Sequence, residues 1–115
     1  MSGLQHGKDI PGDPLTLTLL WGLPGAPKTM LAIRLEADGR GVRLCTDDWQ
    51  AVLGINHSDT GFHGRLQSAL YCHALTLLRH GVDVILEDRL WMKHERTQKL
   101  RDARAYDSRA VLHLF

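Results

Sequence analysis

The strongest structural pattern in the chain is Leu15-Thr-Leu-Thr-Leu-Leu-Trp21-Gly22-Leu23-Pro24-Gly25-Ala26-Pro27-Lys28-Thr29. Residues 15–21 begin with apolar and polar residues in alternation and end in a continuous apolar run, which is typical of a strand buried on both faces of a parallel sheet. The Gly- and Pro-rich residues 22–27 predict a turn. Residues 28–37 carry apolar side chains and stop before Gly39, so a helix is expected there.

The rest of the chain repeats this alternation of strand and helix. Further strands are expected at residues 42–45, 82–86 and 110–115, and helices at residues 62–80 and 93–106. Strands and helices that alternate with short connections favour an α/β, three-layer sandwich with a mainly parallel sheet. The polar, Gly-rich residues 1–13 are expected to be a flexible N-terminal segment, and residues 14–115 to form one domain.

Composition limits the partners and the compartment. The chain has 14 Lys and Arg against 13 Asp and Glu, which gives a net charge of +1. A charge this close to zero gives no electrostatic reason to expect nucleic-acid binding. No apolar run approaches the roughly 18 to 20 residues that span a bilayer, so no membrane partner is expected. Cys45 and Cys72 lie in apolar segments and indicate reduced, packed thiols. These features together predict a cytoplasmic protein.

The turn after the first strand matches most of the phosphate-loop template G-x-x-x-x-G-K-[ST]. In such loops, backbone N–H groups and the helix N-terminus bind phosphate, the Lys neutralises it, and the hydroxyl binds Mg²⁺. The predicted nucleotide contacts are Gly22, Leu23, Pro24, Gly25, Ala26, Lys28 and Thr29. Pro27 replaces the last glycine of the template and removes one N–H group. The alternative is a plain turn in which Pro27 is a favoured residue of the first helical turn.

Acidic residues follow the second and third predicted strands. Asp47 is the candidate general base, because a carboxylate at this place can face phosphates held at the end of the first strand. The alternative is that Asp47 and Asp48 cap a helix. Glu87 is the candidate metal-site acid together with Thr29, whereas Asp88 and Arg89 could equally form an exposed turn.

Other residues carry weaker signals. The seven histidines show no paired metal-ligand spacing. Trp21 and Trp91 are expected to pack rather than to stack on bases. Charges alternate in sign over residues 93–109, as on a solvated helix face, although Arg96 and Arg101 could reach a substrate.

Four segments together resemble the AAA_33-type P-loop kinases, the ATP-binding group that includes chloramphenicol phosphotransferase-like and zeta-toxin-like proteins. Residues 20–29 are similar to the strand and G-L-P-G-S-G-K-T loop of that family, and residues 43–49 to its strand followed by an Asp, an acid and an aromatic residue. Residues 82–87 with Trp91 resemble its third strand, and residues 110–115 its fourth.

The resemblance implies binding of ATP and Mg²⁺ and transfer of the γ-phosphate to a hydroxyl group of a small-molecule acceptor. It places Lys28 and Thr29 on the nucleotide and makes Asp47 the matching acid. Lys28 and Asp47 are therefore the expected catalytic residues, and Thr29 and Glu87 remain the expected metal site from their positions in the chain. Family members continue past the fourth strand into a lid that carries arginines, so the expected domain lacks the C-terminal lid region. Pro27 and the short C-terminus would impair activity, which leaves a non-catalytic nucleotide-binding module as the alternative.

Overall fold

The computed structural model describes residues 15–22, 26–88, 93–105 and 109–114. Within these residues the elements follow the predicted alternation, with one additional helix. They are, in chain order, β1 (Thr16–Trp21), α1 (Ala26–Ala37), β2 (Val42–Cys45), α2 (Thr46–Val52), α3 (Thr60–Arg79), β3 (Val84–Asp88), α4 (Lys93–Ala105) and β4 (Arg109–Leu114). The predicted N-terminal segment lies outside the described residues.

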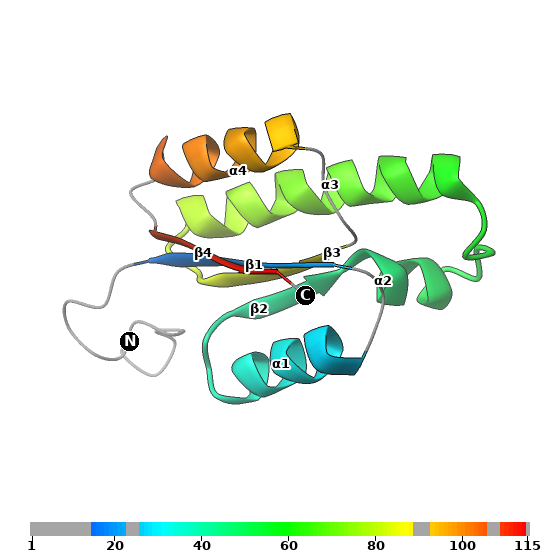
Figure 1. Cartoon of the computed structure of the whole chain (residues 1–115), viewed down its shortest axis with the longest axis horizontal. Coiled ribbons are helices and arrows are strands. Elements are labelled where there is room, and N and C mark those ends of the chain that lie inside the picture. Colours follow the sequence, from blue (N-terminus) through cyan, green and yellow to red (C-terminus); the bar gives the residue numbers. More distant parts are fainter. Residues whose placement is uncertain (1–14, 23–25, 89–92, 106–108, 115) are drawn as a thin grey trace.

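The strands form one sheet in the order β2-β3-β1-β4, and every pairing in it is parallel. β1 therefore lies inside the sheet, between β3 and β4 (Figure 1). Its register with β3 places Leu20 opposite Glu87 and Trp21 opposite Asp88. The last residues of these two strands consequently lie next to each other.

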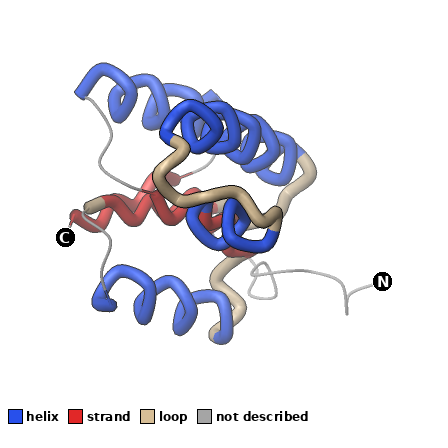
Figure 2. The backbone as a smooth tube through the Cα atoms, turned by 90° about the vertical axis from the view of Figure 1, so that its right-hand side faces the viewer, coloured by secondary structure: helices blue, strands red, loops and turns tan. Residues whose placement is uncertain are grey.

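Helices cover both faces of the sheet, with α1 on one side and α3 and α4 on the other (Figures 1 and 2). The larger core cluster lies on the α3 side and comprises Leu17, Leu19, Trp21, Leu44, Ala74, Leu78, Val84 and Leu86. The smaller one lies on the α1 side and comprises Leu20, Ala32 and Ile85, with Leu31 and Leu35 against it. Because β1 contributes to both clusters, it is buried on both faces, as its sequence predicts.

The topology also locates the ligand crevice. β1 and β3 are neighbours, yet the helices that follow them, α1 and α4, lie on opposite faces of the sheet. In open α/β sheets such a switch point leaves a crevice beyond the carboxyl ends of the strands, where ligands bind. The β1–α1 junction therefore stands where a phosphate loop is expected.

Several local predictions differ from the structure. α1 begins at Ala26, two residues earlier than expected, because Pro27 fits the first turn of a helix. β3 extends through Asp88, so the alternative of an exposed turn is wrong for that residue, and Arg89 lies outside the described residues. Cys45 is buried as predicted, but Cys72 is exposed. Met30 and Ile33 are more than half exposed, at 66% and 52%, so they lie off the buried face of α1.

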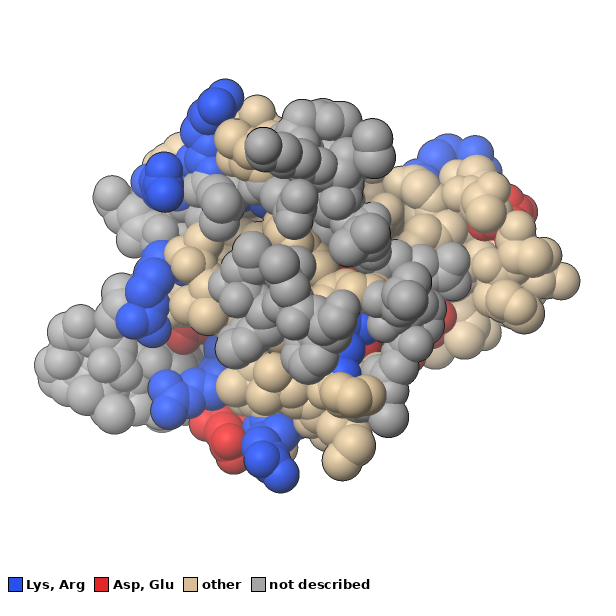
Figure 3. All heavy atoms as spheres, in the orientation of Figure 1, with Lys and Arg blue, Asp and Glu red and all other residues tan. Residues whose placement is uncertain are grey.

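The exterior shows no membrane-spanning element among the described residues. None of the helices described is long and apolar enough to cross a bilayer. On the face shown in Figure 3, Lys and Arg side chains form several separate groups, and acidic side chains lie beside some of them.

Candidate functional site

Lys28 lies in the first turn of α1, and its side chain reaches the carboxyl ends of β1 and β3. Its side chain is buried, with only 3% of the residue exposed. The Nζ atom donates to the carbonyl oxygens of Asp88, at 2.9 Å, and Gly22, at 3.3 Å. The ammonium group thus bridges the ends of both strands, and its two acceptors are neutral. An anionic phosphate oxygen is a stronger partner for an ammonium group than a neutral carbonyl.

Thr29, the next residue of α1, lies against the acid at the end of β3. Its hydroxyl donates to Oε2 of Glu87 at 2.8 Å. A hydroxyl that donates its proton keeps oxygen lone pairs for a cation, and oxygen ligands are those that Mg²⁺ prefers. The two residues predicted for a metal site therefore meet, although 58 positions separate them in the chain.

Arg43, on β2, completes this arrangement, and it was not among the residues predicted for the site. Its guanidinium contacts Oε1 of Glu87 through Nε at 2.9 Å and Nη2 at 2.7 Å. A third nitrogen, Nη1, lies 2.7 Å from Oδ2 of Asp48. Burial by itself lowers the pKa of Arg43, but the hydrogen bond to Asp48 and the charge of Glu87 outweigh it and raise that pKa. The available signal was a lone charged residue inside a short strand.

Asp88 occupies the opposite face of β3 and is almost completely buried, at 2% exposure. Its Oδ1 accepts a hydrogen bond of 2.5 Å from the hydroxyl of Thr46, whereas its Oδ2 is buried without a hydrogen-bond partner. Burial raises the pKa of Asp88 to about 7, against the opposing effects of the Thr46 hydrogen bond and of the charges of Lys99 and Lys28. This carboxyl group therefore titrates near neutral pH.

Thr46, Asp47 and Asp48 begin α2, but they do not cap it. The N-cap residue is Cys45, and its side chain makes no capping hydrogen bond. The Thr46 hydroxyl donates to Asp88 instead. The two aspartates lie in the first turn of α2, where their negative charges interact favourably with the helix dipole. The capping alternative for Asp47 and Asp48 is therefore wrong.

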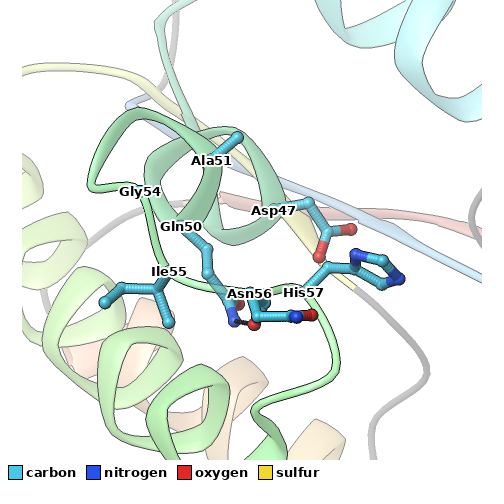
Figure 4. A pocket seen from close by; sticks show the side chains of 7 residues that line it. All are labelled: Asp47, Gln50, Ala51, Gly54, Ile55, Asn56 and His57. Atoms are coloured by element: carbon cyan, nitrogen blue, oxygen red, sulfur yellow. Dashed lines mark hydrogen bonds between the residues drawn. The ribbon is translucent and has the colours of Figure 1, made fainter.

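Asp47 opens onto a cavity of about 670 Å³ between α2 and the segment that leads to α3. The cavity is lined by Asp47, Gln50, Ala51, Ile55, Asn56 and His57 among others, and Figure 4 shows the Asp47 carboxylate beside the His57 ring. Oδ1 of Asp47 also lies 3.6 Å from Nδ1 of His63. Asp47 is thus partly exposed at the wall of a ligand-sized cavity.

A buried network holds the wall of this cavity. Nε2 of Gln50 donates to the carbonyl oxygen of Asn56 at 2.8 Å, which directs its Oε1 toward Nδ1 of His63 at 3.0 Å. Since an amide oxygen only accepts, this places a proton on Nδ1 of His63. Asp59 caps α3 by accepting from the N–H of Phe62 at 2.9 Å. The segment between α2 and α3 is consequently fixed at both ends.

The remaining predicted residues are placed as follows. Gly22 is buried with a φ of 145°, a backbone conformation that favours glycine. Leu23, Pro24 and Gly25 lie outside the described residues, and Ala26 and Pro27 begin α1.

Trp21 packs in the core as expected, and Trp91 lies outside the described residues. Arg101 is exposed on α4, whereas the side chain of Arg96 is not among those described.

The metal-ligand chemistry is that of oxygen donors. Among the described residues, no group of three or more His, Cys, Asp or Glu side chains could by itself hold a metal ion. Mg²⁺, however, is usually held by one or two protein oxygens together with water and substrate phosphates. The Thr29 hydroxyl and the buried Glu87 carboxylate fit that requirement.

An interior parallel strand, a helix with Lys28 and Thr29 in its first turn, and an acid on the neighbouring strand together form the arrangement of a P-loop, kinase-like fold. The chain belongs to the AAA_33 family of AAA domains, whose model matches residues 17–115. This establishes the family and the fold class that the sequence resemblance predicted.

A solved structure has the same fold. The crystal structure of a "putative kinase" from Chloroflexus aurantiacus j-10-fl matches the chain with a TM-score of 0.64 at 20% sequence identity. The match covers 88% of this chain and 58% of that one, so the chain spans less than two thirds of the length of that protein. No curated protein matches the chain.

Proposed function

We propose that this protein is an ATP-dependent phosphotransferase that moves the γ-phosphoryl group of Mg-ATP to a hydroxyl group of a small molecule. One observation carries the proposal. Lys28 and Thr29, adjacent at the start of α1, both contact the end of β3, where Glu87 supplies a buried carboxylate. A cation, a hydroxyl and an acid at one strand end are the parts that phosphoryl transfer requires.

The residues have separate roles on the nucleotide. Gly22 and the N-terminus of α1 would face the phosphates, and Lys28 would exchange its two carbonyl acceptors for phosphate oxygens. Thr29 and Glu87 would hold Mg²⁺, which when bound neutralises charge on the β- and γ-phosphates. These roles use residues that the structure already brings together.

The acceptor would bind in the cavity beside Asp47. Asp47 takes the proton of the acceptor hydroxyl, the hydroxyl oxygen forms a bond to the γ-phosphorus, and the bond from that phosphorus to the β–γ bridging oxygen breaks to release ADP. No Lys or Arg is found among the described residues that line the cavity, and Asp47 adds negative charge. The cavity therefore favours a neutral or cationic hydroxyl compound over a phosphorylated or carboxylated one.

An assay of ADP release against a panel of neutral and amino alcohols tests the proposal. Asp47→Asn keeps the shape of the side chain but cannot accept the proton, so we expect transfer to fall by about 10² to 10⁴-fold with ATP affinity unchanged. Asp38→Asn, an exposed residue in the turn after α1, is the matched control and keeps full activity. Equal activity of Asp47→Asn and wild type contradicts the role of Asp47.

Pro27 favours a second candidate function, nucleotide binding without transfer. It is the second residue of α1, where it withholds one N–H group from the phosphate side of the helix. A lost donor to a charged group corresponds to about 1.5 to 3 kcal/mol, or roughly 10 to 100-fold in affinity. Pro27→Gly should then bind Mg-ATP more tightly by about that factor. Acceptor-dependent turnover by the wild-type protein rejects this candidate.

A further inference from the structure

Arg43 lies on the same face of the sheet as Glu87, at a place fixed by the backbone. The register pairs Arg43 with Ile85 and Cys45 with Glu87, and residues two apart on a strand share a face. The N–H of Arg43 also donates to Oε2 of Glu36 on α1 at 3.0 Å. The guanidinium is therefore presented to Glu87 from a rigid strand rather than from a loop.

The contacts with Glu87 are divided between its two oxygens. Oε1 accepts a hydrogen bond from Nε of Arg43 and forms an ion pair with its Nη2, and Oε2 accepts the hydrogen bond from Thr29. A carboxylate held in this way by one oxygen presents the other in a single direction, toward the start of α1. The side chains of Arg43 and Glu87 are 13% and 4% exposed, so water competes little for these bonds.

Stability alone gives a weak reason for this pair. Replacing a buried ion pair with apolar residues is often neutral or stabilising, because both charges must be stripped of water. Here the pair stands at the residue predicted to hold Mg²⁺. In metal sites, groups that orient a ligand typically change metal affinity by 10 to 100-fold when they are removed.

We infer that Arg43 is a positioning residue for the Mg²⁺ site: it fixes the Glu87 carboxylate so that one oxygen faces Thr29 and the metal bound with the nucleotide. The inference rests on the proposed nucleotide site and adds to it a residue outside the phosphate loop. Asp48, which contacts the far side of the guanidinium and is 59% exposed, braces Arg43 and has the smaller effect.

The test measures the affinity for ATP by titration calorimetry, once with excess Mg²⁺ and once with EDTA. The ratio of the two dissociation constants gives the advantage that Mg²⁺ confers. In Arg43→Met we expect this advantage to fall by about tenfold while the affinity in EDTA is unchanged. Arg34→Met, an exposed arginine of α1, is the matched control and keeps the wild-type ratio.

A double-mutant cycle identifies the route of the effect. Because Arg43 acts through Glu87, adding Arg43→Met to Glu87→Gln should cause no further loss of the Mg²⁺ advantage. If Arg43→Met does not fold, Arg43→Lys is measured in its place. Because one ammonium group cannot span Glu87 and Asp48, we expect Arg43→Lys to lower the Mg²⁺ advantage several-fold. An unchanged Mg²⁺ advantage in the folded variant overturns the inference.

The same titrations separate this inference from the proposed function. Wild-type protein that binds ATP under neither condition rejects the nucleotide site itself, and the role of Arg43 falls with it. Wild-type protein that binds ATP without any Mg²⁺ advantage rejects the metal site and the role of Arg43 but keeps the nucleotide site. Binding with an advantage that Arg43→Met leaves intact rejects the role of Arg43 alone.

Discussion

Asp88 is a carboxyl group whose folded environment changes its chemistry. Its pKa is raised to about 7 from an ordinary value of 3.8, chiefly by burial. Between these two pH values the folded state binds more protons than the unfolded state, so the free energy of unfolding falls as the pH rises through this window. Above about pH 7 this contribution no longer changes. The slope is at most about 1.4 kcal/mol per pH unit.

Asp88→Asn removes this titration while keeping an oxygen for Thr46. We measure the free energy of unfolding by urea denaturation in EDTA. As the pH is raised from 5 to 7, we expect the value for the variant minus the value for the wild type to increase. The exposed Asp38→Asn should show a constant difference from wild type over the same range. A pH-independent difference for Asp88→Asn contradicts the burial effect.

The two cysteines are predicted to differ in reactivity. Burial raises the pKa of Cys45 to about 12, which leaves about one thiol in ten thousand ionised at pH 8. Cys72 is exposed. With a thiol-specific chromogenic reagent at pH 8, one thiol should react at least about a hundredfold faster than the other. In Cys72→Ser the fast phase should vanish; its persistence would show that Cys45 is accessible.

β2 depends on a glycine at its entry. Gly41 has a φ of 142°, and a Cβ atom there would lie 2.7 Å from the carbonyl oxygen of Asp83. Gly39 also has a positive φ, 75°, but a Cβ atom there meets nothing within 4 Å. Gly39→Ala should therefore lower the free energy of unfolding by only about 1 to 2 kcal/mol, the cost of placing a residue with a Cβ atom at a positive φ. Gly41→Ala adds a clash with backbone atoms, which neither strand can relieve by a side-chain rotation.

The difference between the two glycine variants is the measured quantity. We expect the free energy of unfolding of Gly41→Ala to be lower than that of Gly39→Ala by about 1 to 3 kcal/mol, from urea denaturation. Equal values for the two variants would show that β2 is free to move away from Asp83, and would remove the rigid strand on which the role of Arg43 depends.

The elements differ in how well the sequence predicts them. β1 and α3 were predicted because an apolar run bounded by glycine and a long helical repeat are both strong patterns. α2 was not predicted as an element. It has seven residues, and its N-cap, Cys45, provides no capping side chain. The Thr46 hydroxyl that resembles a capping signal is used instead to bind a carboxylate on β3.

Across the whole molecule, the approach of Thr29 to Glu87 could be predicted because the carboxyl ends of parallel strands meet at one edge of a sheet. The strand order β2-β3-β1-β4 could not be predicted from the sequence, because helical connections allow several strand orders. Arg43 was missed for a related reason. Only the pairing of β2 with β3 places a guanidinium beside Glu87, and nothing local to Arg43 reveals that partner.

We predict that the β1–α1 junction binds the phosphates of ATP through Lys28. Titration calorimetry of Mg-ATP into wild type, Lys28→Ala and the exposed control Arg34→Ala measures this binding. We expect saturable binding by wild type and Arg34→Ala, and an affinity lower by at least about tenfold in Lys28→Ala, because a charge-assisted contact of about 1.5 kcal/mol or more is lost. Absence of binding by the wild-type protein, or equal affinity in Lys28→Ala, would rule out a phosphate site that depends on Lys28.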